Sequence, residues 1–135
     1  MADRLRLEVV TPRSRILECE VDEVRLPGAL GELGVLPGHT PLLTSLGTGR
    51  LLWIDHQGGG RLAVQGGFAE VLPNAVTVLA TVAEKPEEID LEATRANLAE
   101  AESALKTASA DELEELTATL RLAETRIKVA TGDDA

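Results

Sequence analysis

The chain has 135 residues, of which 44% are hydrophobic, and its formal net charge at pH 7 is -10. This length corresponds to one or two small domains. Trp53 and Phe68 are its only aromatic residues, too few for the stacking platforms that bind single-stranded nucleic acids. Because phosphate backbones attract positive charge, the acidic balance also argues against nucleic-acid binding, and no nucleic-acid partner is expected.

The negative charge is concentrated in the C-terminal part of the chain. Residues 1–85 carry eight Lys/Arg and ten Asp/Glu, whereas residues 86–135 carry five and thirteen. Such a shift indicates two structural units. No segment approaches the roughly 20 consecutive apolar residues of a membrane-spanning helix, and the N-terminus lacks the apolar core of a secretory signal. We therefore expect the protein to stay in the compartment where it is made, most simply the bacterial cytoplasm.

Residues 5–83 alternate between apolar and polar side chains with the period of β-strands. The first strand places three aliphatic side chains on one face: Leu5, Leu7 and Val9. A second extended stretch covers residues 16–26, and a change of phase within it indicates a bulge or bend. Cys19 lies in this stretch and is predicted to be a buried core thiol. As the only cysteine, it excludes an intrachain disulfide.

Residues 27–50 are rich in glycine and proline, which predicts tight turns between very short strands. Two hairpins are expected next, one joining residues 50–55 to 61–65 and the other joining 68–72 to 75–82. Many short strands with frequent turns, and no helical signal, predict a β sandwich or flattened barrel.

The pattern becomes helical after Lys85-Pro86. Asp90 is a suitable N-cap for a first helix, in which leucines recur every seven residues: Leu91, Leu98 and Leu105. Residues 107–110 interrupt the pattern, and Ser109 with Glu112 fits a capping box. The second helix carries a narrow seam suited to one partner helix: Leu113, Leu116, Leu120, Ala123, Ile127 and Ala130.

These patterns predict an α+β chain in two parts. Residues 1–85 form the β domain, and residues 86–135 form an antiparallel two-helix hairpin. Isolated helices of this length are marginally stable in water. The hairpin should therefore depend on what it packs against, which makes it a candidate moving part.

Few residues suggest catalysis. His39 has no neighbouring serine or cysteine motif to activate, so a structural or interface role is favoured. The two histidines and Cys19 do not have a zinc-site spacing, and the glycine-rich segment matches neither a Walker A sequence nor a dinucleotide fingerprint. We expect no catalytic residue, metal or cofactor. A small hydrolase using His39 remains the least favoured alternative.

The segment from Gly31 to Leu43, with the sequence GELGVLPGHTPLL, is similar to the N-terminal signature of the epsilon subunit of bacterial F-type ATP synthase. Residues 7–12, 66–71 and 74–80 and the acidic hairpin extend the resemblance over nearly the whole chain. It implies a non-catalytic rotor subunit at the cytoplasmic face of the bacterial cell membrane. A freestanding binding module with a helical tail, which would ignore ATP synthase components, is the second alternative.

The resemblance also implies partners. The β domain should bind the gamma stalk and rest on the ring of c subunits, which would couple proton flow to ATP synthesis. The hairpin should either fold against the β domain or extend along gamma toward the catalytic alpha and beta subunits and inhibit ATP hydrolysis.

Carried over by position, the resemblance assigns three sets of contacts. The loop expected to meet the c ring contains Glu32, Leu33 and Gly34. The stretch expected near gamma contains His39, Pro41 and Leu42. The cations that could meet an acidic segment of a catalytic subunit in the extended state are Arg121, Arg126 and Lys128.

Some members of this family bind ATP at the folded hairpin through Ile/Leu-Asp, two variable residues and Arg-Ala. Ile89 and Asp90 match this pattern, but Ala93-Thr94 stands where Arg-Ala is expected. Arg95 is displaced by two positions, about 200° around a helix of 3.6 residues per turn. The arginine pair of the second helix is also incomplete, because only Arg126 fits. We therefore expect weak or no ATP binding.

Overall fold

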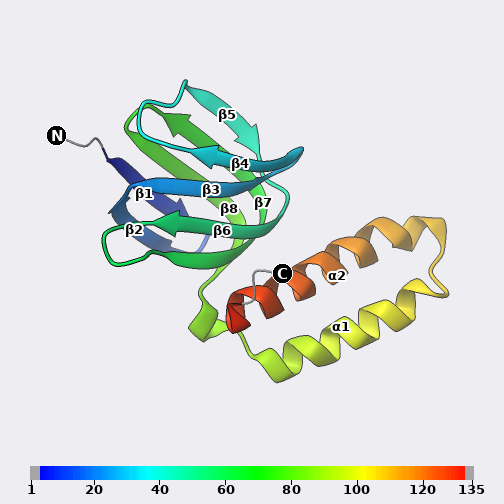
Figure 1. Cartoon of the computed structure of the whole chain (residues 1–135). Coiled ribbons are helices and arrows are strands. Elements are labelled where there is room, and N and C mark those ends of the chain that lie inside the picture. Colours follow the sequence, from blue (N-terminus) through cyan, green and yellow to red (C-terminus); the bar gives the residue numbers. More distant parts are fainter. Residues whose placement is uncertain (1–3, 133–135) are drawn as a thin grey trace.

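A computed structural model of the chain describes residues 4–132. Eight strands precede a short 3-10 turn and two helices (Figure 1), which confirms the predicted α+β class. The strands are β1 (Leu5–Val10), β2 (Arg15–Val21), β3 (Glu23–Gly28), β4 (Gly31–Val35), β5 (Leu42–Ser45), β6 (Thr48–Ile54), β7 (Gly60–Leu72) and β8 (Ala75–Glu84). The predicted bend within residues 16–26 is Asp22, which separates β2 from β3.

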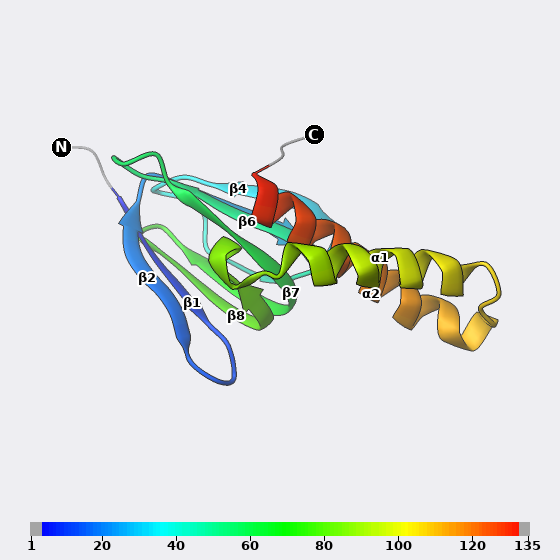
Figure 2. The same ribbon diagram turned by 90° about the horizontal axis from the view of Figure 1, so that it is seen from below.

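The strands form one continuous sheet that folds over on itself. Its order is β2-β1-β8-β7-β6-β3-β4, and β5 pairs with β7. Strands β1 and β8 are parallel. Figures 1 and 2 show β3, β4 and β6 as one layer and β1, β2 and β8 as the other. The core between the layers is aliphatic, with Leu5, Leu7, Val9, Val21, Val24, Leu26, Leu51, Leu62, Val64, Val71, Val76 and Val78 among its buried residues.

Strand β7 differs from its prediction. The segments 61–65 and 68–72 were expected in separate hairpins, but they form one strand of 13 residues. Val64 and Ala69 are both buried although they lie five positions apart, an odd offset that would place them on opposite faces of a regular strand, so the alternation changes phase between them. Gly66 and Gly67, with φ of 71° and 99°, make this change possible because glycine adopts positive φ cheaply.

The change of phase at Gly66 and Gly67 bends β7, so that one edge of this strand pairs with two other strands in succession. Its first half pairs with β6 and its second half with β5. At the bend, a Cβ on Gly67 would lie 2.0 Å from the carbonyl oxygen of Leu79. The close approach of β8 therefore requires glycine at this position.

The two helices begin where the sequence predicts. Helix α1 covers Leu91–Leu105, and the side chain of Asp90 accepts a hydrogen bond from the Ala93 N–H at 3.0 Å. Helix α2 covers Ala110–Thr131, and the Glu112 carboxylate accepts from the Ser109 N–H at 3.3 Å. The 3-10 turn η1 (Pro86–Glu88) connects β8 to this hairpin.

Helix α2 packs on two sides. It lies between α1 and the sheet (Figure 1), where it contacts β6 and β7. Toward α1 the buried side chains are small, among them Thr94, Ala101 and Ala123. A second buried stripe consists of Leu122, Thr125 and Val129. The predicted seam of α2 packs on α1, and the second stripe, which the sequence pattern did not indicate, covers the β domain.

Candidate partner-binding surfaces

The three residues expected at the c ring lie on strand β4. Glu32 and Gly34 are exposed, and Leu33 is partly buried against the core. The expected loop is thus a strand, which pairs with β3 along one side and ends the sheet order. In the turn before it, Leu30 is fully exposed. A carboxylate and an apolar side chain therefore stand together at this edge of the β domain.

The residues expected near gamma lie between β4 and the start of β5. Pro41 and Leu42 are exposed, and they line a shallow hollow with Leu72 and Glu70. The ring Nδ1 of His39 lies 2.6 Å from the carbonyl oxygen of Thr40. Within residues 4–132, no serine or cysteine side chain pairs with this ring, so the structure adds no support for the hydrolase alternative.

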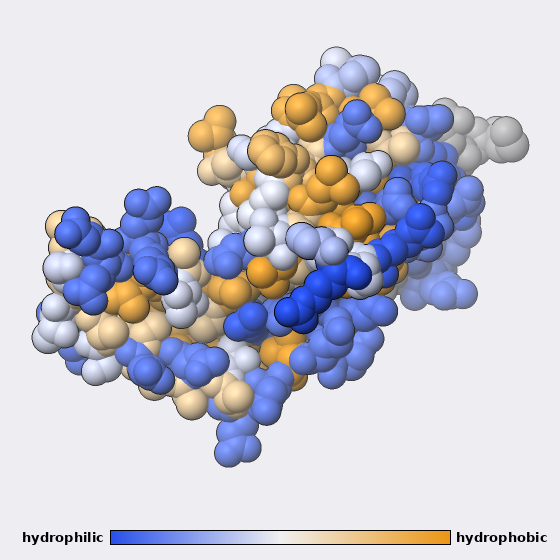
Figure 3. Space-filling model, turned by 180° about the vertical axis from the view of Figure 1, so that it is seen from behind, coloured by the Kyte–Doolittle hydropathy of each residue, from blue (hydrophilic) through white to orange (hydrophobic). Residues whose placement is uncertain are grey.

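An exposed apolar surface continues from this hollow over β5, β7 and β8. We call it the outer apolar face, and it consists of Leu43, Phe68, Leu72 and Leu79. Leu43, Phe68 and Leu79 are 71%, 56% and 54% exposed, and Phe68 lies directly opposite Leu79 in the sheet. Figure 3 shows hydrophobic side chains gathered over this side of the β domain. Scattered apolar residues are normal on protein surfaces, but adjacent ones commonly mark an interaction site.

The sequence contained a signal for this face that the strand analysis missed. Ala69 and Val71 point inward, and two of the three residues in the outward phase, Phe68 and Leu72, are also apolar, with Glu70 between them. An antiparallel strand with one face in water normally carries polar residues on that face. The excess of apolar residues therefore predicts either a second buried face or a partner.

The structure separates the three cations expected to meet the catalytic subunits. Arg121 and Lys128 are exposed on α2. Arg126 instead forms a bidentate ion pair with Glu84, the last residue of β8, with an Nε–Oε1 distance of 2.6 Å and an Nη2–Oε2 distance of 3.2 Å. Arg126 is therefore engaged within the molecule.

Two further polar contacts attach α2 to β7. Gln65 donates from Nε2 to the Ala118 carbonyl at 3.2 Å, and Arg61 donates from Nε to the Val129 carbonyl at 2.6 Å. The Val129 carbonyl belongs to the last helical turn, where carbonyls have no partner within the helix. Because this end of a helix is electronegative, the Arg61 guanidinium complements it.

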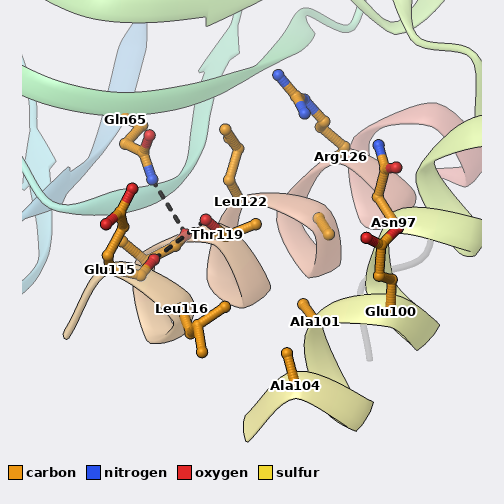
Figure 4. A pocket seen from close by; sticks show the side chains of 12 residues that line it. Gln65, Asn97, Glu100, Ala101, Ala104, Glu115, Leu116, Thr119, Leu122 and Arg126 are labelled. Carbon is orange, nitrogen blue, oxygen red and sulfur yellow. Dashed lines mark hydrogen bonds between the residues drawn. The ribbon is translucent and has the colours of Figure 1, made fainter. Parts of the chain in front are cut away.

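A cavity of about 440 Å³ opens between the helices and β7. Figure 4 shows Leu122 directed toward the strands and Leu116 directed toward Ala101 and Ala104 of α1. The other lining residues include Gln65, Asn97, Glu100, Glu115, Thr119 and Arg126. Ile89 and Asp90 are not among them, and Asp90 caps α1. Of the three candidate ATP residues, only Arg126 lines this cavity.

Other functional features can be stated for residues 4–132. They contain no group of His, Cys, Asp and Glu side chains arranged to hold a metal ion. None of their helices has both the length and the apolar character needed to cross a membrane. Cys19 is partly buried against the core, and this burial raises the pKa of its thiol.

The fold and these surfaces define a class of two-part subunits that join a β sandwich, which carries the exposed binding surfaces, to a helical hairpin. The family described as ATP synthase, Delta/Epsilon chain, beta-sandwich domain matches residues 4–86. The ATP synthase epsilon chain of Geotalea uraniireducens is 48% identical over 112 residues, covering 83% of this chain and 81% of the relative. Epsilon chain 2 of Syntrophotalea carbinolica is 44% identical over 132 residues, covering 96% of both chains.

A solved structure also shares the fold over nearly the whole chain. A chain of the Euglena gracilis mitochondrial ATP synthase, in an assembly of OSCP, F1 and c-ring, matches with a TM-score of 0.81 and 25% identity. This match covers 93% of the present chain and 80% of the other. The protein belongs to the epsilon-chain family of F-type ATP synthase.

Proposed function

We propose that the chain is a non-catalytic rotor subunit of ATP synthase, in which the β domain couples the c ring to gamma and the hairpin restrains ATP hydrolysis. Family membership and the fold shared with the Euglena assembly support this role. A solved structure titled as the central stalk and c ring of the Tetrahymena thermophila enzyme has a similar fold, with a TM-score of 0.53 and 11% identity. The subunit would act at the cytoplasmic face of the bacterial membrane, held there by its partners.

The outer apolar face is the observation that carries the gamma contact. It is continuous with Pro41 and Leu42, the positions that the family resemblance places near gamma. Burying one large apolar side chain contributes about 1.5–3 kcal/mol. Leu43, Phe68 and Leu79 therefore supply enough apolar surface for a stable contact, and His39 lies four positions before Leu43 in the chain.

The edge at β4 is proposed as the contact with the c ring. Glu32 provides a charge, while Leu30 in the adjoining turn provides an apolar side chain in full contact with solvent. Leu33 and Gly34 fix the strand that presents them. This edge is separate from the outer apolar face, so gamma and the c ring can be bound together.

The hairpin is proposed to act on the catalytic subunits when it extends. Arg121 and Lys128 are exposed on α2 and available to an acidic segment. The buried contacts of α2 with the sheet are few, so the folded and extended arrangements can be close in free energy. Such a balance suits a regulatory element.

A binding measurement with purified gamma tests this proposal. Replacing Phe68 and Leu79 together by serine should weaken the complex by at least about tenfold, since even a partial loss of their burial exceeds 1.4 kcal/mol. The matched control is Ile54→Ser, a leucine-sized side chain that is 44% exposed on β6. If the wild-type chain formed no complex with gamma, or if the control weakened binding equally, the proposed interface would be wrong.

A further inference from the structure

A charged pair joins α2 to the β domain. Glu84 ends β8 and Arg126 lies near the end of α2, so 42 residues separate them in sequence. Their side chains are 28% and 27% exposed, and the shortest N–O distance is 2.6 Å. A bidentate pair of this kind is geometrically selective, because it forms only when α2 lies in one position on the sheet.

The apolar part of the same interface is small. It is supplied from α2 by Leu122 and Val129, with Thr125 between them. Gln65 and Arg61 donate hydrogen bonds to backbone carbonyls of α2. These carbonyls would be present whatever side chains the helix carried. Of these contacts, the pair of Glu84 and Arg126 depends on the identity of a side chain of α2 and on its charge.

We propose that the Glu84–Arg126 pair is a latch that holds the hairpin on the β domain and keeps Arg126 from acidic partners. The Glu84 carboxylate binds the Arg126 guanidinium in the same way that a carboxylate of an acidic partner segment would bind it. Arg121 and Lys128 stay exposed in the folded state, whereas Arg126 becomes available only when α2 leaves the sheet. The role of Arg126 toward a partner rests on the proposed function, but the latch itself does not.

Hydrogen exchange of the isolated full-length chain tests the latch. Glu84→Gln and Arg126→Gln should each raise the exchange rate of the α2 amides by about fivefold, a typical effect of losing a partly exposed ion pair with good geometry. The same rise should appear in the wild type when salt screens the pair, and the variants should lose this salt response. Exchange within β1 and β2 should stay unchanged and serves as the internal reference.

Two sets of variants complete this measurement. The double reversal Glu84→Arg with Arg126→Glu should exchange more slowly than either single reversal, because it restores opposite charges. Arg121→Gln is the matched control, since Arg121 is an exposed arginine of the same helix that forms no ion pair within residues 4–132. The latch would be overturned if both glutamine variants left the exchange of the α2 amides unchanged. It would also be overturned if the effect of the double reversal on this exchange equalled the sum of the effects of the single reversals.

Sequestration of Arg126 has its own readout. Phenylglyoxal labels accessible guanidinium groups, and mass spectrometry can compare Arg126 with Arg121 in one sample. In the wild type Arg126 should be labelled severalfold more slowly than Arg121, and Glu84→Gln should remove this difference. Equal labelling of the two arginines in the wild type would contradict sequestration. No gamma or catalytic subunit is present, so failure here is separate from failure of the proposed function.

Discussion

At the scale of single residues, charge decides what the cavity beneath the hairpin can hold. Glu100 and Glu115 line it, and the one arginine among its lining residues is engaged by Glu84. Carboxylates repel a triphosphate. We predict that calorimetric titration with ATP shows no binding in the micromolar range, and that replacing both carboxylates by glutamine raises any residual affinity. A micromolar dissociation constant for the wild type would show that this charge argument is wrong.

Residue roles were predictable where their cause is local. Asp90 and the pair of Ser109 and Glu112 were recognised because a helix start is decided within four residues. Gly67 was not, since its constraint comes from the Leu79 carbonyl on another strand. Arg126 matched a family position in the sequence, but its partner lies 42 residues away, and no local pattern indicates that pairing.

At the scale of elements, α2 buries two stripes of side chains, and the sequence pattern revealed only the stripe that packs on α1. The stripe facing α1 is aliphatic and was found, whereas the stripe of Leu122, Thr125 and Val129 mixes polar and apolar residues. Because Thr125 interrupts it, the sequence does not distinguish this stripe from a solvated face. Strand β7 raises the same difficulty, because its continuity through Gly66 and Gly67 depends on pairing with β5, β6 and β8.

The two faces of α2 lead to a prediction for the stability of the folded hairpin. Leu122→Ala should weaken docking of α2 by about 2 kcal/mol, at the low end for a buried leucine, because the side chain is 9% exposed and points toward the strands. Leu113→Ala, at a position that is 51% exposed, should change it by less than about 0.5 kcal/mol. Hydrogen exchange of the α2 amides measures both, and equal effects would refute the two-sided packing.

At the scale of the whole molecule, the β domain and the hairpin differ in which buried contacts stabilise them. The described core cluster of the β domain is built from residues between Leu5 and Ala83, so it does not need the hairpin. The hairpin has few large buried side chains of its own and gains Leu122 and Val129 from contact with the sheet. One part can therefore serve as a fixed coupling while the other changes position.

Truncation after Lys85 tests this division of roles. The remaining β domain should unfold cooperatively on heating, since its core is intact, and should still assemble with gamma through the outer apolar face. ATP hydrolysis by the assembled enzyme should rise, because the element proposed to restrain it is absent. Glu84→Gln in the full-length chain is the informative comparison: a weakened latch frees the hairpin without deleting it, so hydrolysis should fall. Hydrolysis that is unchanged by the truncation would mean that the hairpin is not a brake in this enzyme.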